Sequence, residues 1–183
     1  GVAQNLKLTS VNVLDRLSAV NSNITNLSAN KLYVANSVIQ TTINTEGAPY
    51  TINSATIVQT AISGTITPHF KNSKILVDID VYSSKDDYGG GFFLGRHDVT
   101  NNTMTTLISS AKDSNGYYMF YSNNSHEYDS NRIFLEDSIP AGSTELRYIL
   151  SAAGYGLESW YLNYSISNRI NPGSLMRIDE IAQ

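Results

Sequence analysis

Short runs in which apolar and polar residues alternate dominate the sequence from about residue 37 onward, and this pattern constrains the fold more than any other feature. The clearest run is 74–82, where every second residue is an isoleucine or a valine. A period of two residues is that of a β-strand with one buried face. Further runs of this kind cover 55–62, 91–98, 104–109, 117–121, 132–136, 145–152, 160–166 and 175–181.

No helical segment of the length needed for a parallel crossover separates these runs, so a parallel α/β architecture is excluded. Many short strands with turn residues between them are typical of two packed antiparallel sheets. The sequence therefore predicts an all-β fold, a jelly-roll-like β-sandwich, for a head domain that covers residues 37–183.

Charge and composition exclude several classes of function. Charged residues make up 15% of the 183 residues and the net charge is −4, so the basic surface that nucleic acid binding needs is not expected. No apolar run approaches the ~20 residues of a membrane span. The chain has no cysteine, which removes disulfides, thiolate nucleophiles and sulfur-ligated metals. We predict no cofactor, no metal, no nucleic acid partner and no membrane insertion.

Residues 1–36 follow a different pattern from the rest of the chain, with apolar residues at steps of three, four or seven. Such spacing forms the seam of a coiled coil, and mixed isoleucine, valine and leucine at the seam is compatible with trimers. The intervening asparagines and serines are weak helix formers, so an extended or β-type stalk and a disordered tail remain alternatives. An ordered seam predicts a trimerisation stalk and a homotrimer. The seam residues are Leu6, Val13, Leu17, Val20, Ile24, Leu27 and Val34.

Candidate catalytic residues are few and scattered. Asp78 and Asp80 would share one face of a strand, but they alternate with apolar residues, so a solvated sheet face is the favoured interpretation. His97 beside Asp98 lacks the serine context of a hydrolytic triad. The two acids and three glycines of 85–91 lack the ligand spacing of a calcium loop, and a tight hairpin explains them better. We predict that the chain is not an enzyme.

The segment 116–129 is the most suggestive of binding, because it places aromatic residues among asparagine, serine, histidine and glutamate. Aromatic faces bordered by hydrogen-bonding groups suit sugars and proteins alike. The alternative is that these tyrosines fill the core or an interface. The candidate ligand-binding residues, from the loops between residues 84 and 130, are Tyr88, Tyr117, Tyr118, Tyr121 and Tyr128.

A turn is expected at residues 139–143, where Pro140 and Gly142 separate two strong strands. Proline suits the second position of a β-turn, and glycine a later position with positive φ. The sequence therefore predicts a left-handed backbone conformation at Gly142.

Three stretches resemble the C-terminal domains of bacteriophage virion fibre proteins, especially those of marine and cyanobacterial phages. They are Thr65–Pro68 followed by Ser73–Val77; Phe134–Asp137 followed by Pro140, Ser143 and Tyr148; and the ending Ser174–Ile181. The similarity covers about residues 37–183, while 84–130 follows no pattern of that family.

The resemblance implies a tail fibre or virion fibre head that sits on a stalk and mediates host attachment. Its expected partners are two further copies of the chain, other virion proteins through the N-terminus, and a host surface receptor with carbohydrate among the candidates. Its expected location is the surface of the virion. The alternative is a purely structural fibre that decorates the capsid or tail without a receptor of its own.

Overall fold

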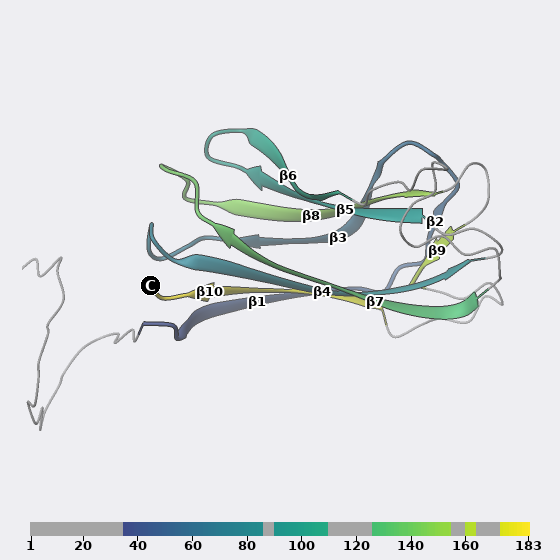
Figure 1. Cartoon of the computed structure of the whole chain (residues 1–183), viewed down its shortest axis with the longest axis horizontal. Helices are drawn as coiled ribbons and strands as arrows, with labels where there is room; N and C mark the ends of the chain where they lie inside the picture. Colours follow the sequence, from purple (N-terminus) through teal and green to yellow (C-terminus); the bar gives the residue numbers. More distant parts are fainter. Residues whose placement is uncertain (1–34, 86–89, 110–125, 155–159, 164–172) are drawn as a thin grey trace, which may run out of the picture. The chain divides into compact units, whose positions relative to one another are not determined.

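The runs of alternating residues form strands throughout the described part of residues 37–183, and Figure 1 shows how these strands are arranged. The computed structural model describes residues 35–85, 90–109, 126–154, 160–163 and 173–183. Within these ranges the strands are β1 (Val38–Glu46), β2 (Tyr50–Ile52), β3 (Val58–Ile66), β4 (Lys74–Lys85), β5 (Gly90–Asp98), β6 (Thr103–Ser109), β7 (His126–Ser138), β8 (Leu146–Gly154), β9 (Trp160–Leu162) and β10 (Ser174–Ile181).

The described strands form two antiparallel sheets that pack face to face. One is six-stranded, with β1, β10, β4 and β7 side by side and the short strands β9 and β2 added beyond the start of β10. The other is four-stranded, in the order β3-β8-β5-β6. With the short β2 and β9 set aside, the long strands follow the orders 1-8-3-6 and 2-7-4-5, which is the topology of a jelly roll. The predicted all-β sandwich is confirmed.

The core lies between the sheets and consists of the apolar faces that the alternation marks. Ile75, Val77, Ile79 and Val81 of β4 are all fully buried, as the run 74–82 predicts. The rings of Phe92 and Trp160 lie with centroids 4.7 Å apart. Such a pair adds about 0.5–1.5 kcal/mol to the free energy gained from area burial.

The sandwich is closed along one side by amide side chains of β1. Asn44 donates its Nδ2 to the carbonyl oxygen of Ser63 in β3, and Gln40 donates Nε2 to the carbonyl oxygen of Thr67 at 2.7 Å. These bonds join the edges of the two sheets although β1 and β3 are not paired as strands. They satisfy backbone acceptors that an open edge would leave exposed.

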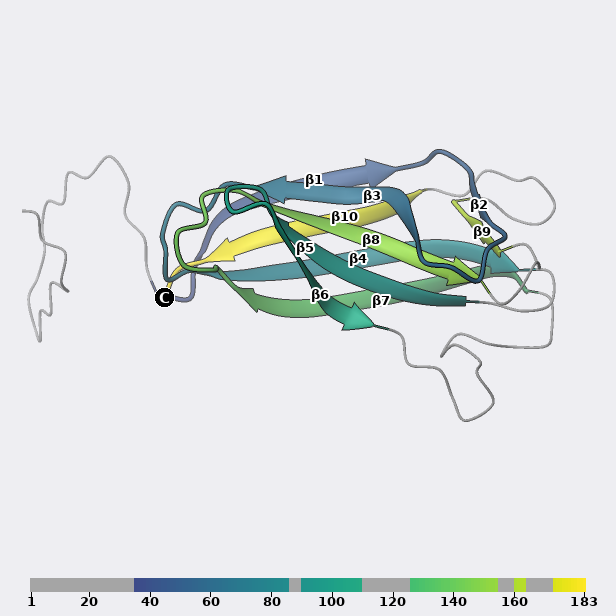
Figure 2. The same ribbon diagram turned by 90° about the horizontal axis from the view of Figure 1, so that it is seen from above.

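Strand direction gives the sandwich two different ends, seen from two sides in Figures 1 and 2. At one end, named the base here, β1 begins and β10 ends, and the backbone nitrogen of Asn36 donates to the carbonyl oxygen of Ala182 at 2.8 Å. The base also holds the connections 67–73, 99–102 and 139–145. At the opposite end, named the far end, β4, β6 and β8 finish and β5, β7 and β10 begin.

The turn at the base before β8 has the predicted conformation. Gly142 has a φ of 81°, and the backbone nitrogen of Ser143 donates to the carbonyl oxygen of Pro140 at 3.1 Å. A φ in this region is readily adopted by glycine and costs a side-chain-bearing residue about 1–3 kcal/mol. The prediction of a left-handed Gly142 is confirmed.

Candidate binding face

The residues predicted from sequence to bind a ligand or to form a trimer fall largely where the structure gives no description. Tyr88, Tyr117, Tyr118 and Tyr121 lie outside the described residues, and Tyr128 lies in β7 without a described side chain. The seam from Leu6 to Val34 also lies outside them. The strands next to 86–89 and 110–125 end or begin at the far end of the sandwich. These residues remain predictions.

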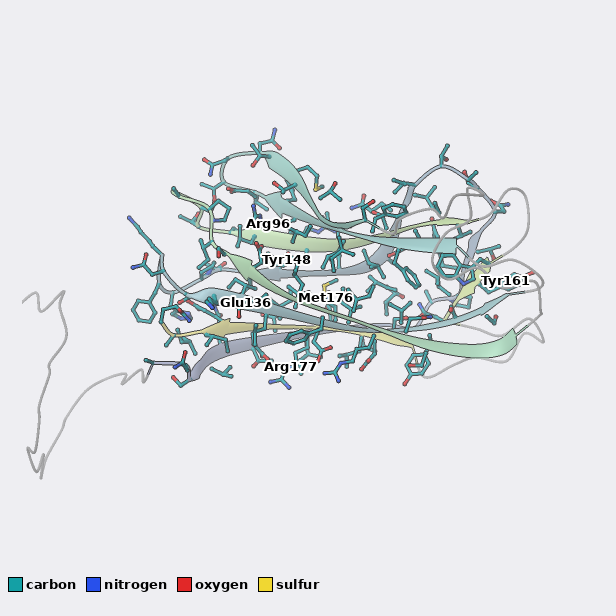
Figure 3. All side chains as sticks on the ribbon, viewed as in Figure 1. Arg96, Glu136, Tyr148, Tyr161, Met176 and Arg177 are labelled. Carbon is teal, nitrogen blue, oxygen red and sulfur yellow. The ribbon has the colours of Figure 1, made fainter. Side chains whose placement is uncertain are left out.

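The outer face of the six-stranded sheet is a charged surface in which each described ion pair is local. Arg132 Nη2 lies 2.6 Å from Asp78 Oδ2, Lys74 Nζ lies 2.5 Å from Glu136 Oε1, and Arg177 Nε lies 2.9 Å from Asp179 Oδ2. The hydrogen bonds from Arg132 hold the pKa of Asp78 below its usual value. Figure 3 places Arg177 outside the layers, and Tyr148 and Met176 between them. Asp78 and Asp80 thus belong to a solvated face, as predicted.

The outer face of the four-stranded sheet differs, because small, hydroxyl and apolar side chains cover it. In β5 and β8, the side chains of Phe92, Leu94, Tyr148 and Leu150 point into the core. The residues between them therefore point to this outer face. Among described residues, no ion pair joins side chains of this face. The register aligns three rows across the strands: Gln59, Ser151, Phe93 and Ser109; Ser63, Ile149, Gly95 and Thr106; Thr65, Arg147, His97 and Met104.

A depression of about 360 Å³ lies over the first two rows and is named the outer groove. Gly95 forms part of its floor, and a β-carbon built there would lie 3.3 Å from the sulfur of Met104. Phe93 and Ile149 are nearly buried beside Gly95, while Ile57 and Met104 stand exposed at its margin. The other lining residues are Gln59, Leu94, Thr106, Ser109 and Ser151. Apolar surface with a few hydrogen-bonding groups is the usual make-up of a ligand site.

A second depression of about 430 Å³ adjoins the outer groove toward the base and is named the Arg147 pocket. Its lining is mainly polar, in contrast to that of the outer groove. Arg147 donates Nη2 to Ser63 Oγ at 3.3 Å, and His97 Nε2 lies 3.3 Å from Asn102 Oδ1. The lining residues are Asn44, Ser63, Gly64, Thr65, His97, Val99, Glu145 and Arg147.

Between the sheets, one buried ion pair connects the two layers. Arg96 of β5 places Nη1 2.6 Å and 2.8 Å from the carboxylate oxygens of Asp137 in β7. The hydroxyl of Tyr148 in β8 donates to the same carboxylate at 2.8 Å. Burial, together with the negative charge of Asp137, raises the pKa of Tyr148 far above its ordinary value. The phenol therefore stays a hydrogen-bond donor at physiological pH, and the cluster is structural.

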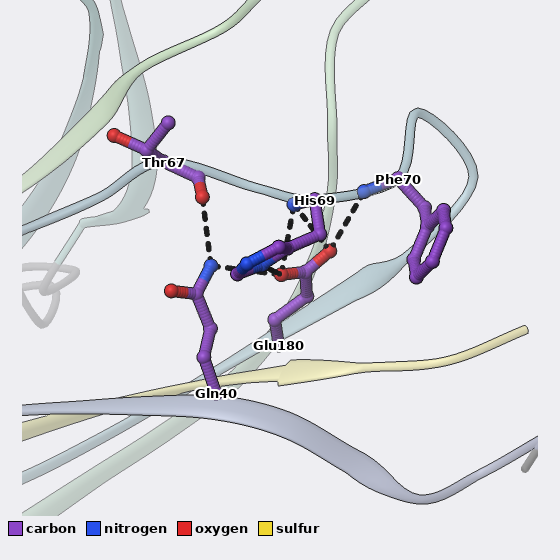
Figure 4. A network of polar contacts seen from close by, with 5 residues as sticks. All are labelled: Gln40, Thr67, His69, Phe70 and Glu180. Carbon is purple, nitrogen blue, oxygen red and sulfur yellow. Dashed lines mark hydrogen bonds and ion pairs between the residues drawn. The ribbon is translucent and has the colours of Figure 1, made fainter. Parts of the chain in front are cut away.

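At the base, the buried carboxylate of Glu180 organises the loop between β3 and β4 (Figure 4). It accepts the backbone N–H groups of His69 and Phe70 at 2.9–3.0 Å and the side-chain amide of Gln40 at 2.8 Å. His69 Nδ1 lies 3.0 Å from it as well. Burial alone would raise the pKa of Glu180, but the hydrogen bonds from the loop, those of the His69 and Phe70 backbones first, together lower it. His69 therefore anchors a loop.

The dipeptide of His97 and Asp98 does not form part of a triad, because neighbouring strand residues point to opposite faces. His97 faces the Arg147 pocket. Asp98 is buried and accepts hydrogen bonds from Ser143 and Asn101, which lower its pKa.

Two further features of the described part of the chain concern metal binding and membrane spans. None of its residues form a group of three or more histidine, aspartate or glutamate side chains able to hold a metal ion. Within the same part, no helix has the length and apolarity to cross a membrane.

The sequence matches no protein-family model and no curated protein. Among solved structures, it is similar to a chain of infectious bursal disease virus, Gt strain, with 13% identity and a TM-score of 0.45 over 92% of this chain and 43% of that one. The corresponding values for the Gx strain are 12% identity, a TM-score of 0.40, and 92% and 42% coverage. For the T13 particle of the same virus, the identity is 13% and the TM-score is 0.36, over 92% of this chain and 41% of that one.

The chain thus spans less than half the length of these solved chains. Because the identities and TM-scores are this low, the function must be argued from the residues of this chain. The outer groove, which sequence reasoning missed, is the best described site for that purpose. Its one sequence signal is Gly95 inside a strand pattern, since such a glycine marks a bulge or a close approach.

Proposed function

We propose that this chain is the head of a virion fibre or spike, and that it attaches the particle to carbohydrate on the host surface through the outer groove. The observation that carries the proposal is the outer face of the four-stranded sheet, where an apolar floor is bordered by hydroxyl and amide side chains. Sugar rings offer an apolar face and a rim of hydroxyl groups, so both kinds of surface have a counterpart.

The jelly-roll topology and the resemblance to phage fibre domains add support. Jelly rolls are common in viral capsid proteins and in lectins, although a fold alone does not define a function. The proposal includes the homotrimer expected from residues 1–36. Three shallow sites on one particle would bind a multivalent surface far more strongly than one site, because the second and third contacts become intramolecular. Light scattering should then give about three times the 20.1 kDa chain mass.

The test is binding of the full chain to a glycan array and to intact cells of candidate hosts. Gly95→Val fills the floor of the outer groove, because the added methyl groups project from the position where the β-carbon meets Met104. We expect binding to fall at least tenfold while the melting temperature stays within about 3 °C. The control is Phe134→Thr, which removes an exposed aromatic ring from the opposite outer face and should leave binding intact.

Binding that survives Gly95→Val would contradict the outer groove as the site. Single alanine variants of Tyr88, Tyr117, Tyr118, Tyr121 and Tyr128 would then test the earlier prediction, with lost binding at unchanged melting temperature as its signature.

The purely structural fibre remains the second candidate function, and one observation favours it. Ile43 and Phe134 are more than half exposed and lie in the same row of the six-stranded sheet, which would suit contact with another virion protein. Absence of any glycan or cell binding, together with stable incorporation into particles, would support this function.

A further inference from the structure

Arg147 differs from the other arginines that the structure describes. Arg96, Arg132 and Arg177 each lie within 3 Å of a carboxylate oxygen. Arg147 lines the Arg147 pocket on an exposed part of β8, and its described side-chain hydrogen bond goes to the hydroxyl of Ser63 at 3.3 Å. Among described residues, no acidic group lies within ion-pair distance of it. Among described residues, its guanidinium is therefore a positive charge without an ion-pair partner.

The surroundings of Arg147 offer further hydrogen-bonding groups and one opposing charge. Ser63, Thr65 and His97 lie in the same row or the next one across the sheet. Glu145 also lines the pocket, and it lies two residues from Arg147 along the chain. Although Glu145 is close to Arg147 in sequence, the carboxylate of Glu145 makes no described ion pair with the guanidinium of Arg147. The charge of Arg147 is thus reduced by Glu145 but not cancelled by direct contact.

The Arg147 pocket and the outer groove are placed to bind one ligand. Arg147 and Ile149 lie two residues apart on the same face of β8, and His97 and Gly95 are related in the same way on β5. Two residues along a strand span about 7 Å. A cation and hydroxyl groups therefore lie next to an apolar floor, on the rigid surface of a sheet.

We propose that the Arg147 pocket binds the acidic group of an anionic saccharide, a carboxylate or a sulfate, while the neighbouring sugar ring lies over Gly95 and Ile149 in the outer groove. This inference rests on the proposed function and names its ligand class. A guanidinium donates two parallel hydrogen bonds to a carboxylate or sulfate, which a hydroxyl or amide cannot do with the same strength. The chain carries a net charge of −4, so recognition of an anion must come from this local contact.

The experiment measures affinity of the full chain by calorimetry for three probes: an oligogalacturonide, which carries carboxylates, a carrageenan oligosaccharide, which carries sulfates, and neutral maltoheptaose. We expect at least one acidic probe to bind tenfold or more tightly than maltoheptaose. Preference between the two acidic probes identifies which group the pocket accepts. Raising the salt concentration should weaken that binding, because the charge contact is exposed to solvent.

Variants assign the effect to the pocket. Arg147→Gln should reduce affinity for the acidic probe at least tenfold, and Arg147→Lys should retain part of it, since the charge remains but the two-pronged geometry is lost. Arg132→Gln is the matched control, because it removes one positive charge from the outer face of the other sheet. It should leave affinity unchanged. Thermal melting of each variant separates lost binding from lost folding.

Each contrary result has a distinct meaning. If wild-type chain binds maltoheptaose as tightly as the acidic probes, and Gly95→Val abolishes that binding, the proposed function stands and the acidic ligand is overturned. Equal losses in Arg147→Gln and Arg132→Gln would show general charge attraction and overturn the pocket. If no acidic probe binds at all, the inference is overturned. Lack of binding to any array glycan or host cell would overturn the proposed function with it.

Discussion

The two outer faces of the sandwich come from the same kind of strand but have different chemistry. On the six-stranded sheet, the described arginines and Lys74 pair with carboxylates of the same or a neighbouring strand. On the four-stranded sheet, the same alternation presents glycine, serine, threonine and isoleucine, and the charge of Arg147 lacks a described partner. The described basic side chains of the first face are paired within that face. The second leaves hydrogen-bonding capacity and apolar area available to a ligand.

The largest expected effect comes from breaking the contact that joins the two sheets. Asp137→Ala removes the partner of Arg96, whose side chain is 13% exposed, and leaves the hydroxyl of Tyr148 without its acceptor. Loss of one partner of a buried ion pair costs about 3–5 kcal/mol of unfolding free energy. Urea denaturation measures this loss directly.

Asp78→Ala is the matched control for that variant, since Asp78 pairs with an arginine on the outer face of the six-stranded sheet. An exposed pair contributes about 0–1 kcal/mol. Equal losses of unfolding free energy in Asp137→Ala and Asp78→Ala would show that the buried ion pair contributes no more to stability than the exposed one.

A second prediction concerns acid, and it compares a buried carboxylate with an exposed one. The pKa of Glu180 in the folded chain lies below its ordinary value of 4.5. Its contribution to stability is therefore fully present above about pH 4.5 and is lost as the pH falls through the folded pKa. Glu180→Gln should lower the unfolding free energy at pH 7 by about 1–3 kcal/mol and flatten the acid limb of the stability curve.

Glu136→Gln provides the control, because Glu136 lies on the outer face with half of its side chain exposed. Denaturation curves between pH 3 and 7 should show little difference from wild type. An acid limb that persists in Glu180→Gln would mean that other carboxylates dominate it.

A third, smaller effect separates two glycines that serve different purposes. Gly142 has a φ of 81°, so Gly142→Val should cost about 1–3 kcal/mol of unfolding free energy through backbone strain. Gly95 lies in a strand with ordinary φ, and only the flexible end of Met104 lies within 3.4 Å of an added β-carbon. Gly95→Val should change the unfolding free energy by about 0.5 kcal/mol or less. A reversed order would remove the structural basis for using Gly95→Val as a binding probe.

The smallest effect is expected on the outer face of the six-stranded sheet. Ile43→Thr replaces a residue that is 58% exposed with another β-branched residue, so the strand preference is kept. The unfolding free energy should stay within about 0.5 kcal/mol of wild type, and glycan binding should not change. Loss of glycan binding in Ile43→Thr would place the binding site on the outer face of the six-stranded sheet and contradict the difference between the two faces.

Local alternation was sufficient to predict the sandwich, because a strand buried on one face marks that face in its own sequence. The run 74–82 falls inside β4, and Trp160 and Leu162 share a buried face as expected. β1 was harder, since its threonines and asparagines alternate with few apolar residues and its role depends on amide bonds to β3. The strand predicted from residue 55 begins at Val58.

The candidate binding face could not be predicted in the same way, because strand register creates it. Gly95 and Ile149 lie 54 residues apart in sequence and become neighbours only when β5 pairs with β8. From the sequence of one strand, its outward residues are recognised only as polar or small. Which residues of other strands lie beside them is not visible until the register is known. A glycine within the run 91–98 was the available signal, and the β5–β6 register does shift between Leu94 and Gly95.

The antiparallel pairing of β1 with β10 also determines how the head responds to mechanical load. β1 begins at the base and pairs with β10 from Val38 to Glu46. A tension applied at Val38 and resisted toward the far end runs parallel to these strands, so the hydrogen bonds between them are loaded in shear and must fail together. The same tension applied between Val38 and Ile181, which are paired at the base, would peel the two strands apart one bond at a time. The sandwich should therefore withstand pulling along its length far better than pulling between Val38 and Ile181.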